Sequence, residues 1–323
     1  MRALGVVAVV LVAACSQPAI GTQTSTPSQS VAASSCKLPV WWGGEGQDVH
    51  AAFVSVPDGA VTDASVHPRG LPGTYGASYE GVSHKWLGVS ANALSPDRSR
   101  YAYWTGTPAG SEVHVVDVAT KADSVVYSGL PLYVVVGFGP DAIYLTHAIQ
   151  LRRGSFERLY RLDQSGGTPQ LVTGSDRHMY QWGWVLVADG AAWGIDNRVV
   201  GNDHFYSVLR LDLATSQVTK WMEGPPNTMS WPMGVDGMHR LYVAPINGPL
   251  WRIDSPGHSV ELASPADVTF GNSIGGPTSF VADSHGVWFS GKSAVWLSAD
   301  GRAPQQFAVA PAREDVWPAG PCV

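Results

Sequence analysis

Short apolar stretches alternate with aspartate-containing turns along most of the chain. In "ALSPDRSRYAYW", residues 93–104, a Ser-Pro-Asp turn separates an apolar stretch from a Tyr-Ala-Tyr alternation. Similar turns recur at steps of 44, 48, 47 and 47 residues, with their aspartates at Asp97, Asp141, Asp189, Asp236 and Asp283. Each aspartate follows one apolar stretch and precedes another, which predicts a β-hairpin with a tight turn at every one of these positions.

A second marker recurs between those turns with nearly the same period. Apolar stretches of the type "VHVVD" end at Asp117, Asp163, Asp212 and Asp254, and a degenerate copy, "VWLSA", spans residues 295–299. A period near 45 residues that carries about four short strands is typical of β-propeller blades. A β-sandwich with coincidental spacing is the alternative.

The two ends of the chain supply the strands of one further blade. The C-terminal "EDVWPAGPCV" is similar to the innermost strand that begins "SWPMGVDG" at Ser230. The N-terminal stretches "CKLPVWWGG", "AAFVSVPDG" and "GAVTDASV" predict the other three strands of the same blade. We therefore predict an all-β propeller of six four-stranded blades, one of them closed by both ends. A seventh blade within residues 58–85 is the alternative, although that segment lacks both markers.

The blade pattern resembles the TolB-type and related WD-repeat-like propellers of exported bacterial proteins. The best match is "SPDRSRYAYWTGTPAGSEVHVVDVAT", residues 95–120, and the resemblance spans roughly residues 86–307. It implies an architecture and not an activity, because one fold hosts many functions.

The first 35 residues are not expected to belong to the propeller. "MRALGVVAVVLVAAC" has one positive residue, Arg2, and an apolar run too short to span a bilayer, as in a secretory signal. Its end, "LVAAC", resembles a bacterial lipobox, which implies that Cys15 is lipidated. An ordinary cleaved signal with a chance cysteine is the alternative. Residues 16–35 lack charge and predict a flexible tether. We thus expect a signal peptide at 1–15, a propeller at 36–323, and an extracytoplasmic protein anchored by lipid to the cell membrane or an outer membrane.

Two cysteines remain besides Cys15. Cys36 begins the predicted propeller and Cys322 is next to last in the chain. In an exported protein such a pair predicts a disulfide, and this one would join the two ends of a closed ring.

Composition narrows the class of ligand. Only 14% of the residues are charged, the net charge is −6, and no run of Lys or Arg forms a basic stripe, so nucleic acid is not an expected partner. No zinc-peptidase, nucleophile-elbow, phosphate-loop or dinucleotide motif occurs, so no catalytic residue is assigned. No cofactor is expected, a divalent metal held by several blades stays an open alternative, and we expect a monomer.

The propeller prediction also sorts residues onto two faces. The aspartate turns lie on one face; loops between second and third strands, and passages between blades, lie on the other, here called the channel face. Polar and aromatic candidates for binding there are His84, Trp104, His147, Arg152, Arg153, Arg177, His178, Tyr180, Trp182, Asp196, Asp203, His204, Trp231, Glu314, Asp315 and Trp317. The alternatives are ordinary exposed loops for the polar residues and packing between blades for the tryptophans.

Two classes of function follow. The first is a membrane-anchored binding or scaffold module that holds a protein or a cell-envelope glycan on the channel face. The alternative is an exported, lactonase-like hydrolase or a lyase with its site at the central channel.

Overall fold

The computed structural model describes residues 35–43, 49–64, 76–147, 158–176, 183–245, 249–263, 280–292, 294–299, 304–309 and 315–323. They belong to one compact unit, residues 34–323. The predicted signal peptide and all but the last residue of the predicted tether lie outside the described residues. Within the described ranges, no helix has the length and apolar character needed to cross a membrane.

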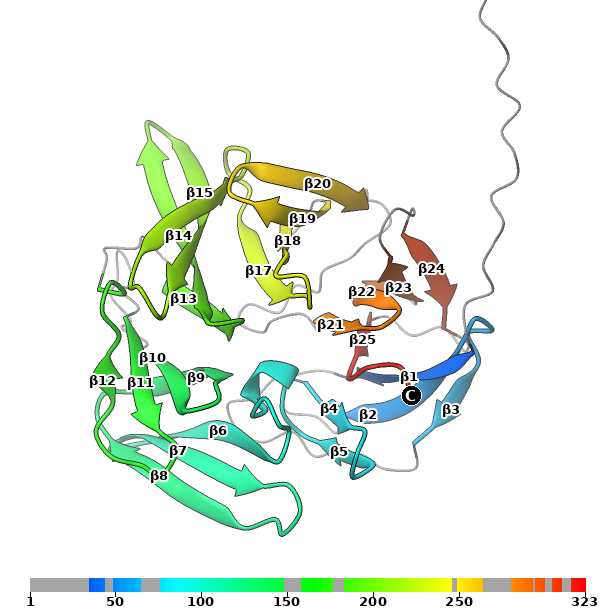
Figure 1. The fold of residues 1–323 in the computed structure, drawn as a ribbon, viewed down its shortest axis with the longest axis horizontal. Helices are drawn as coiled ribbons and strands as arrows, with labels where there is room; N and C mark the ends of the chain where they lie inside the picture. Colours follow the sequence, from blue (N-terminus) through cyan, green and yellow to red (C-terminus); the bar gives the residue numbers. More distant parts are fainter. Residues whose placement is uncertain are drawn as a thin grey trace, which may run out of the picture. The chain divides into compact units, whose positions relative to one another are not determined.

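Three antiparallel sheets have four strands each, in chain order (Figure 1). The first contains β9 (Tyr133–Phe138), β10 (Ala142–His147), β11 (Leu159–Asp163) and β12 (Gln170–Leu171). The second contains β13 (Gly183–Ala188), β14 (Ala191–Val200), β15 (Asp203–Asp212) and β16 (Val218–Glu223). The third contains β17 (Ser230–Val235), β18 (Leu241–Pro245), β19 (Leu250–Ser255) and β20 (His258–Ala263). The turns at Asp141, Asp189 and Asp236 join the first and second strands of these sheets, as predicted.

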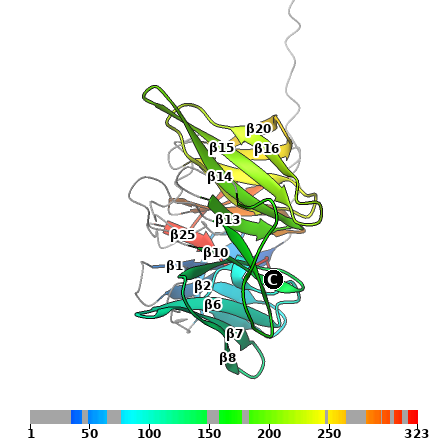
Figure 2. The ribbon, with the colours of Figure 1, turned by 90° about the vertical axis from the view of Figure 1, so that its left-hand side faces the viewer.

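The blade around Asp97 differs from the prediction. A three-stranded sheet is formed by β6 (Arg100–Thr107), β7 (Gly110–Asp117) and β8 (Asp123–Gly129), which lie side by side in Figure 2. The stretch around Trp86, where the resemblance to the propellers begins, forms β5 (Lys85–Leu87) and pairs with β4 (Ser78–Glu80), so no described fourth strand joins the sheet of β6.

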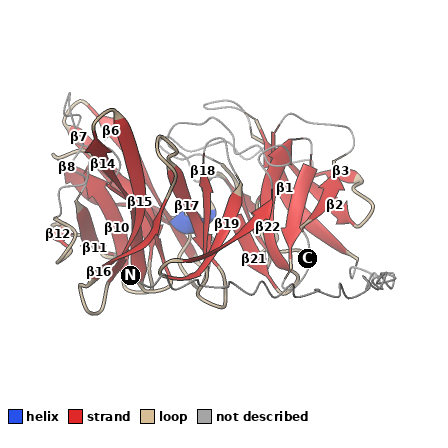
Figure 3. Cartoon of the chain, turned by 90° about the horizontal axis from the view of Figure 1, so that it is seen from above, coloured by secondary structure: helices blue, strands red, loops and turns tan. Residues whose placement is uncertain are grey.

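Local backbone geometry explains that difference. The chain leaves the extended conformation after Leu87 and forms the 3-10 helix η1 (Ala91–Ala93), drawn in blue in Figure 3. Only Leu94 then bridges to Tyr101. Because the hairpin β4–β5 belongs to neither neighbouring sheet, the count of six blades stays a prediction.

One sheet contains strands from both ends of the chain, as predicted, and is called the closing sheet. Its four strands are β25 (Asp315–Pro318), β1 (Cys36–Trp42), β2 (His50–Val56) and β3 (Val61–Asp63), in this spatial order. Trp41 pairs with Trp317 and Val40 with Pro318. β25 also pairs with β22 of the sheet formed by β21 (Phe280–Asp283), β22 (Gly286–Lys292), β23 (Ala294–Ser298) and β24 (Gln305–Ala308). The predicted disulfide joins Cys36 to Cys322, with their Cα atoms 5.7 Å apart.

Apolar side chains between successive sheets form the core. Tyr144 and Leu159 of one sheet pack with Trp184 and Leu211 of the next. Trp184, Trp193 and Trp288 are among the largest fully buried side chains. Burial of such apolar surface is the main favourable contribution to folding.

The aspartates of the two sequence markers stabilise the turns by hydrogen bonds. Asp117, Asp163 and Asp212 each accept a backbone N–H from a residue two or three positions later, at 2.7, 2.8 and 2.9 Å. Hydrogen bonds from Ser95 and Ser99 lower the pKa of Asp97 to about 2. The two repeats thus mark turn chemistry and not a catalytic site.

Candidate functional site

Several residues predicted for the channel face cannot be placed. Those outside the described residues are Arg152, Arg153, Arg177, His178, Tyr180, Trp182 and Glu314. Asp315 begins β25, although its side chain is not described. The described candidates divide among an aromatic cluster, a polar hairpin and the packed core, except for His84, which lies on the opposite face.

The aromatic cluster lies across β6 to β11, toward the channel-face ends of the strands. Val113 of β7 pairs with Trp104 on one side and with Tyr127 on the other, so the three residues form one row across the sheet. Tyr127 contacts Tyr133 edge to face, with ring centroids 5.2 Å apart. We call the set Trp104, Tyr127, Tyr133, His147 and Tyr160 the aromatic patch.

Tyr133 lies at the centre of the aromatic patch. Its ring centroid is 5.0 Å from that of Tyr160 and 5.9 Å from that of His147, the residue with which it pairs between β9 and β10. Tyr133 is buried, whereas Trp104, Tyr127, His147 and Tyr160 are half-buried and present part of each ring to solvent. The sheet geometry therefore places the rings of Tyr127, His147 and Tyr160 around the buried ring of Tyr133, with Trp104 in the same sheet row as Tyr127.

Burial sets the charge of the aromatic patch. Burial, followed by the neighbouring Tyr160 and Tyr127, raises the pKa of Tyr133 to about 12. Burial and then the nearby Arg158 lower the pKa of His147, so its imidazole is neutral at neutral pH. The indole Nε1 of Trp104 is buried and donates no hydrogen bond within the described part of the chain. The patch is thus an uncharged surface with hydroxyl, imidazole and indole groups, suited to stacking on an uncharged ring.

A second group of predicted residues meets on the long hairpin β14–β15, which reaches beyond its neighbours in Figure 1. His204 shares a hydrogen bond with Asn197 across the hairpin, 2.9 Å between Nδ1 and Nδ2. Asn227 holds the same end of the hairpin: its Nδ2 donates to Asp203 Oδ1, and its Oδ1 accepts the backbone N–H of His204, both at 3.0 Å. Asp196 lies on β14 opposite Ser207. These bonds fix the shape of the hairpin end, so His204 and Asp203 have structural partners.

The placed tryptophans of the inner strands pack in the core. Trp317 is buried and stacks on Trp41, with ring centroids 5.8 Å apart. Trp231 packs against the cluster that contains Met233 and Tyr242. Both positions agree with the packing alternative and not with an aromatic rim.

His84 lies at the other face. Its hairpin is held by Arg98, whose Nη2 donates to Tyr79 O at 2.8 Å, and by the bond from Tyr79 N to Ala319 O at 2.8 Å. Arg98 belongs to the Asp97 turn, so this hairpin folds back toward the aspartate turns and His84 does not join the channel-face residues.

The inner strands enclose a small cavity. It measures about 20 Å³ and is lined by residues of β4, β17, β21 and β25 and of the segment around η1, among them Ser78, Asn92 and Met233. This is room for about one water molecule and far less than the few hundred Å³ typical of a small-molecule site. Among the described residues, the aromatic patch on the channel face is therefore better suited than this cavity to bind a large ligand.

Sequence reasoning missed three members of the aromatic patch. Tyr127, Tyr133 and Tyr160 stand in strands and were assigned to no loop of the channel face. Two features of the sequence could have pointed to these tyrosines. One is the alternation "VVYSG" at residues 125–129, and the other is the position of Tyr160 directly before the "RLD" marker. Their meeting depends on how two sheets pack, which no local pattern specifies.

Comparison with known proteins identifies the fold. By sequence, the chain matches no protein-family model and no curated protein. By structure, it is similar to TolB from Acinetobacter baumannii, with a TM-score of 0.53 and 11% identity over 88% of this chain and 67% of that chain.

Other similar structures have lower TM-scores. They include a TolB-type protein from Agrobacterium tumefaciens, at 0.45 and 10% identity over 90% of this chain and 94% of that chain. An oligogalacturonate lyase in complex with manganese scores 0.44 at 13% identity over 67% of this chain and 63% of that chain. The similarity to the Acinetobacter protein shows that the described part of this chain has the fold of the TolB-type β-propellers.

Proposed function

We propose that this protein is an exported, lipid-anchored binding module that holds a cell-envelope glycan on the aromatic patch. The observation that carries the proposal is the gathering of three half-buried rings, those of Tyr127, His147 and Tyr160, around Tyr133 at the channel-face ends of the strands. The half-buried Trp104 lies in the same sheet row as Tyr127 and packs against the same cluster. Aromatic faces stack on the apolar faces of sugar rings, and Tyr hydroxyls and the His imidazole bind sugar hydroxyls.

The charge of the aromatic patch favours a neutral sugar over an anionic ligand. The hydroxyls of Tyr133 and Tyr127 are protonated at neutral pH, since the pKa of Tyr133 is raised to about 12 and that of Tyr127 is also raised by burial. The imidazole of His147 is neutral for the reason given above. Arg158 adds to the effect of burial in lowering the pKa of His147.

The N-terminal sequence supports the anchored part of the proposal. A lipidated Cys15 followed by 20 uncharged residues would hold the propeller at the envelope, where peptidoglycan and other glycans are abundant. A flexible chain of that length has a mean reach on the order of 25 Å. Binding by a tethered module gains from the resulting high local concentration of ligand.

The test measures binding of the full chain to soluble peptidoglycan fragments and neutral envelope oligosaccharides. Trp104→Ala is expected to weaken glycan binding by about fivefold or more, since one stacked ring contributes roughly 1 kcal/mol beyond area burial. The matched control is Trp221→Ala, which removes a half-buried Trp of β16 that packs on Trp193 with centroids 4.7 Å apart. Both variants lose packing contacts, so a difference between their glycan affinities indicates a binding site on the aromatic patch.

Each other outcome overturns the proposal in a specific way. Equal binding by both variants would place the glycan elsewhere. No glycan binding, together with capture of an envelope protein by cross-linkers placed at Tyr160, would favour a protein partner. Turnover of a lactone or a polyuronate by the wild-type chain would favour the enzyme alternative.

A further inference from the structure

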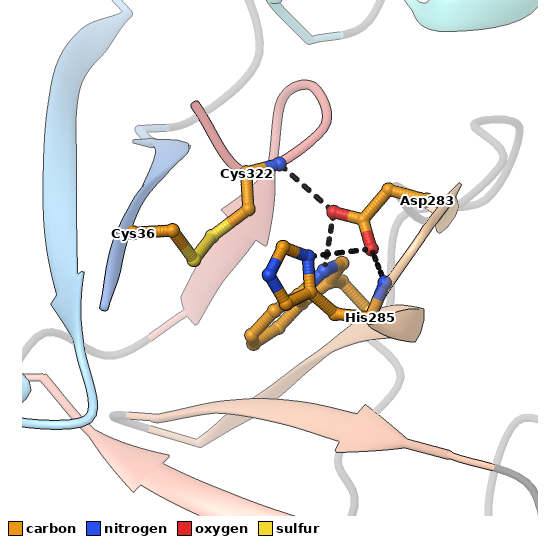
Figure 4. The surroundings of a disulfide bond; sticks show 5 residues. Cys36, Asp283, His285 and Cys322 are labelled. Carbon is orange, nitrogen blue, oxygen red and sulfur yellow. Dashed lines mark hydrogen bonds and ion pairs between the residues drawn. A yellow bond between two sulfur atoms is a disulfide. The ribbon is translucent and has the colours of Figure 1, made fainter. Parts of the chain in front are cut away.

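The disulfide of the closing sheet has an ordered polar neighbourhood (Figure 4). Asp283 sits in the β21–β22 turn and accepts three hydrogen bonds. Its Oδ2 accepts the backbone N–H of Cys322 at 2.9 Å and the indole N–H of Trp288 at 2.8 Å. Its Oδ1 accepts the backbone N–H of His285 at 2.8 Å. One buried carboxylate thus fixes both the position of Cys322 and the turn that carries His285.

Three metal-binding atoms come together at this point. The sulfurs of Cys36 and Cys322 and one ring nitrogen of His285 all lie within 4.8 Å of one another. Figure 4 shows the imidazole of His285 beside the disulfide. All three residues are half-buried, so solvent reaches the group without unfolding of the sheet. Two sulfurs and one imidazole form the ligand set of a Cys₂His zinc site that keeps its fourth position open for water.

The backbone would keep this group together without the disulfide. Lys37 N donates to Val323 O at 2.9 Å, and Val323 N donates to Lys37 O at 3.0 Å. These bonds join the residues next to the two cysteines, and the pairing of β1 with β25 holds the same two segments together. Because the Cα atoms are 5.7 Å apart, the two sulfurs can separate to the roughly 3.5 to 4 Å of neighbouring zinc ligands by side-chain rotation.

His285 also has the oriented environment that metal-binding histidines usually have. Its Nδ1 lies 3.3 Å from Asp283 Oδ1, and its side chain is 24% exposed against 7% for Asp283. A carboxylate beside one ring nitrogen orients the imidazole and fixes its tautomer.

We propose that the reduced form of this protein binds a thiophilic divalent metal ion, Zn²⁺ being the biological case, through Cys36, Cys322 and His285. A dithiol reductant supplies two electrons and two protons, becomes a disulfide itself, and leaves two cysteine thiols. Each thiol then gives its proton to water when its sulfur binds the ion. The same two sulfurs form either the disulfide or the metal site, so metal binding protects the thiols from oxidation and keeps the closing sheet linked in both states. This inference is independent of the proposed glycan function.

The experiment uses the full chain with Cys15→Ser, which removes the third sulfur. The chain is reduced with a dithiol, freed of reductant without air, and titrated with Zn²⁺ and with Co²⁺ as a spectroscopic probe. One ion per reduced chain is expected, with the near-ultraviolet charge-transfer absorption of thiolate-bound Co²⁺. The oxidised chain is expected to lack both signals.

The variant His285→Ala keeps the disulfide and both sulfurs, and is expected to lower the affinity of the reduced chain for Zn²⁺ about tenfold or more. The matched control is His258→Ala, an exposed histidine at the start of β20. Equal affinity in both variants, or equal metal uptake by oxidised and reduced chains, would overturn the proposal. Circular dichroism of the reduced, metal-free chain separates loss of the site from loss of the fold.

Discussion

Lys37 and Val323 exchange both of their backbone hydrogen bonds, at 2.9 and 3.0 Å, and so join β1 to the segment that follows β25. The residues next to them, Cys36 and Cys322, add a covalent link across a sequence separation of 286 residues. The backbone hydrogen bonds and the disulfide therefore hold the same two chain segments together.

The first prediction concerns the disulfide. Replacing both Cys36 and Cys322 by Ser is expected to lower the free energy of unfolding by up to about 5 kcal/mol, because the unfolded chain regains the entropy of a very long loop. The backbone ladder is expected to hold the closing sheet at room temperature, so the double variant stays folded with a lower melting temperature. Thermal unfolding of wild type and variant checks this, and an unchanged melting temperature would contradict a role for the link in stability.

A second prediction concerns acid. Hydrogen bonds from Ser95 and Ser99 lower the pKa of Asp97 from 3.8 to about 2. The pKa values of Asp117, Asp163 and Asp212 are also lowered, first by bonds from Thr120, Ser165 and Thr215.

A carboxyl group with a lowered folded-state pKa stabilises the fold above its unfolded pKa. That contribution is lost as the pH falls through the folded value. The melting temperature is therefore expected to fall between about pH 4 and pH 2. Asp97→Asn should make this fall shallower, whereas Asp58→Asn, in the exposed β2–β3 turn, should leave it unchanged.

The third prediction concerns close packing between two sheets. A Cβ at Gly234 of β17 would overlap the ring of Phe280 of β21, whereas a Cβ at Gly237 meets no atom within 4 Å. Gly234→Ala is expected to lower the free energy of unfolding by about 1–3 kcal/mol, as overpacked cores do. Gly237→Ala is expected to change it by less than about 0.5 kcal/mol. Chemical denaturation of the two variants gives the comparison, and equal effects would mean that β21 shifts freely.

A fourth prediction tests the anchor. Cys15→Ser is expected to move the protein from the membrane fraction to the soluble extracytoplasmic fraction, because the lipid would have no thiol to attach to. Ser16→Ala is the matched control and should remain in the membrane fraction. Retention of the Cys15 variant in membranes would rule out the lipoprotein interpretation.

The sequence predicted the parts of the fold that depend on local turn chemistry. The aspartate turns and the strands that end at Asp117, Asp163 and Asp212 appear where the period places them. The closing sheet could be predicted because "VWPAG" repeats the start of another inner strand.

Other features depend on contacts between distant segments. The stretch around Trp86 has the composition of an inner strand, yet it pairs with β4, since the turns that follow Leu87 remove it from the sheet of β6. The aromatic patch was only half predicted: Trp104 and His147 were candidates, but Tyr127 and Tyr133 meet only because the β6–β8 sheet packs on the next one.

The closing sheet also sets an order of events during synthesis. One edge of β1 pairs with β2, which follows within a few residues, but its other edge pairs with β25 near the end of the chain. The ring therefore cannot close until residues 315–318 have been made, and contacts of such long range form late in folding. Until then β1 presents an open strand edge, where a nascent chain can pair wrongly.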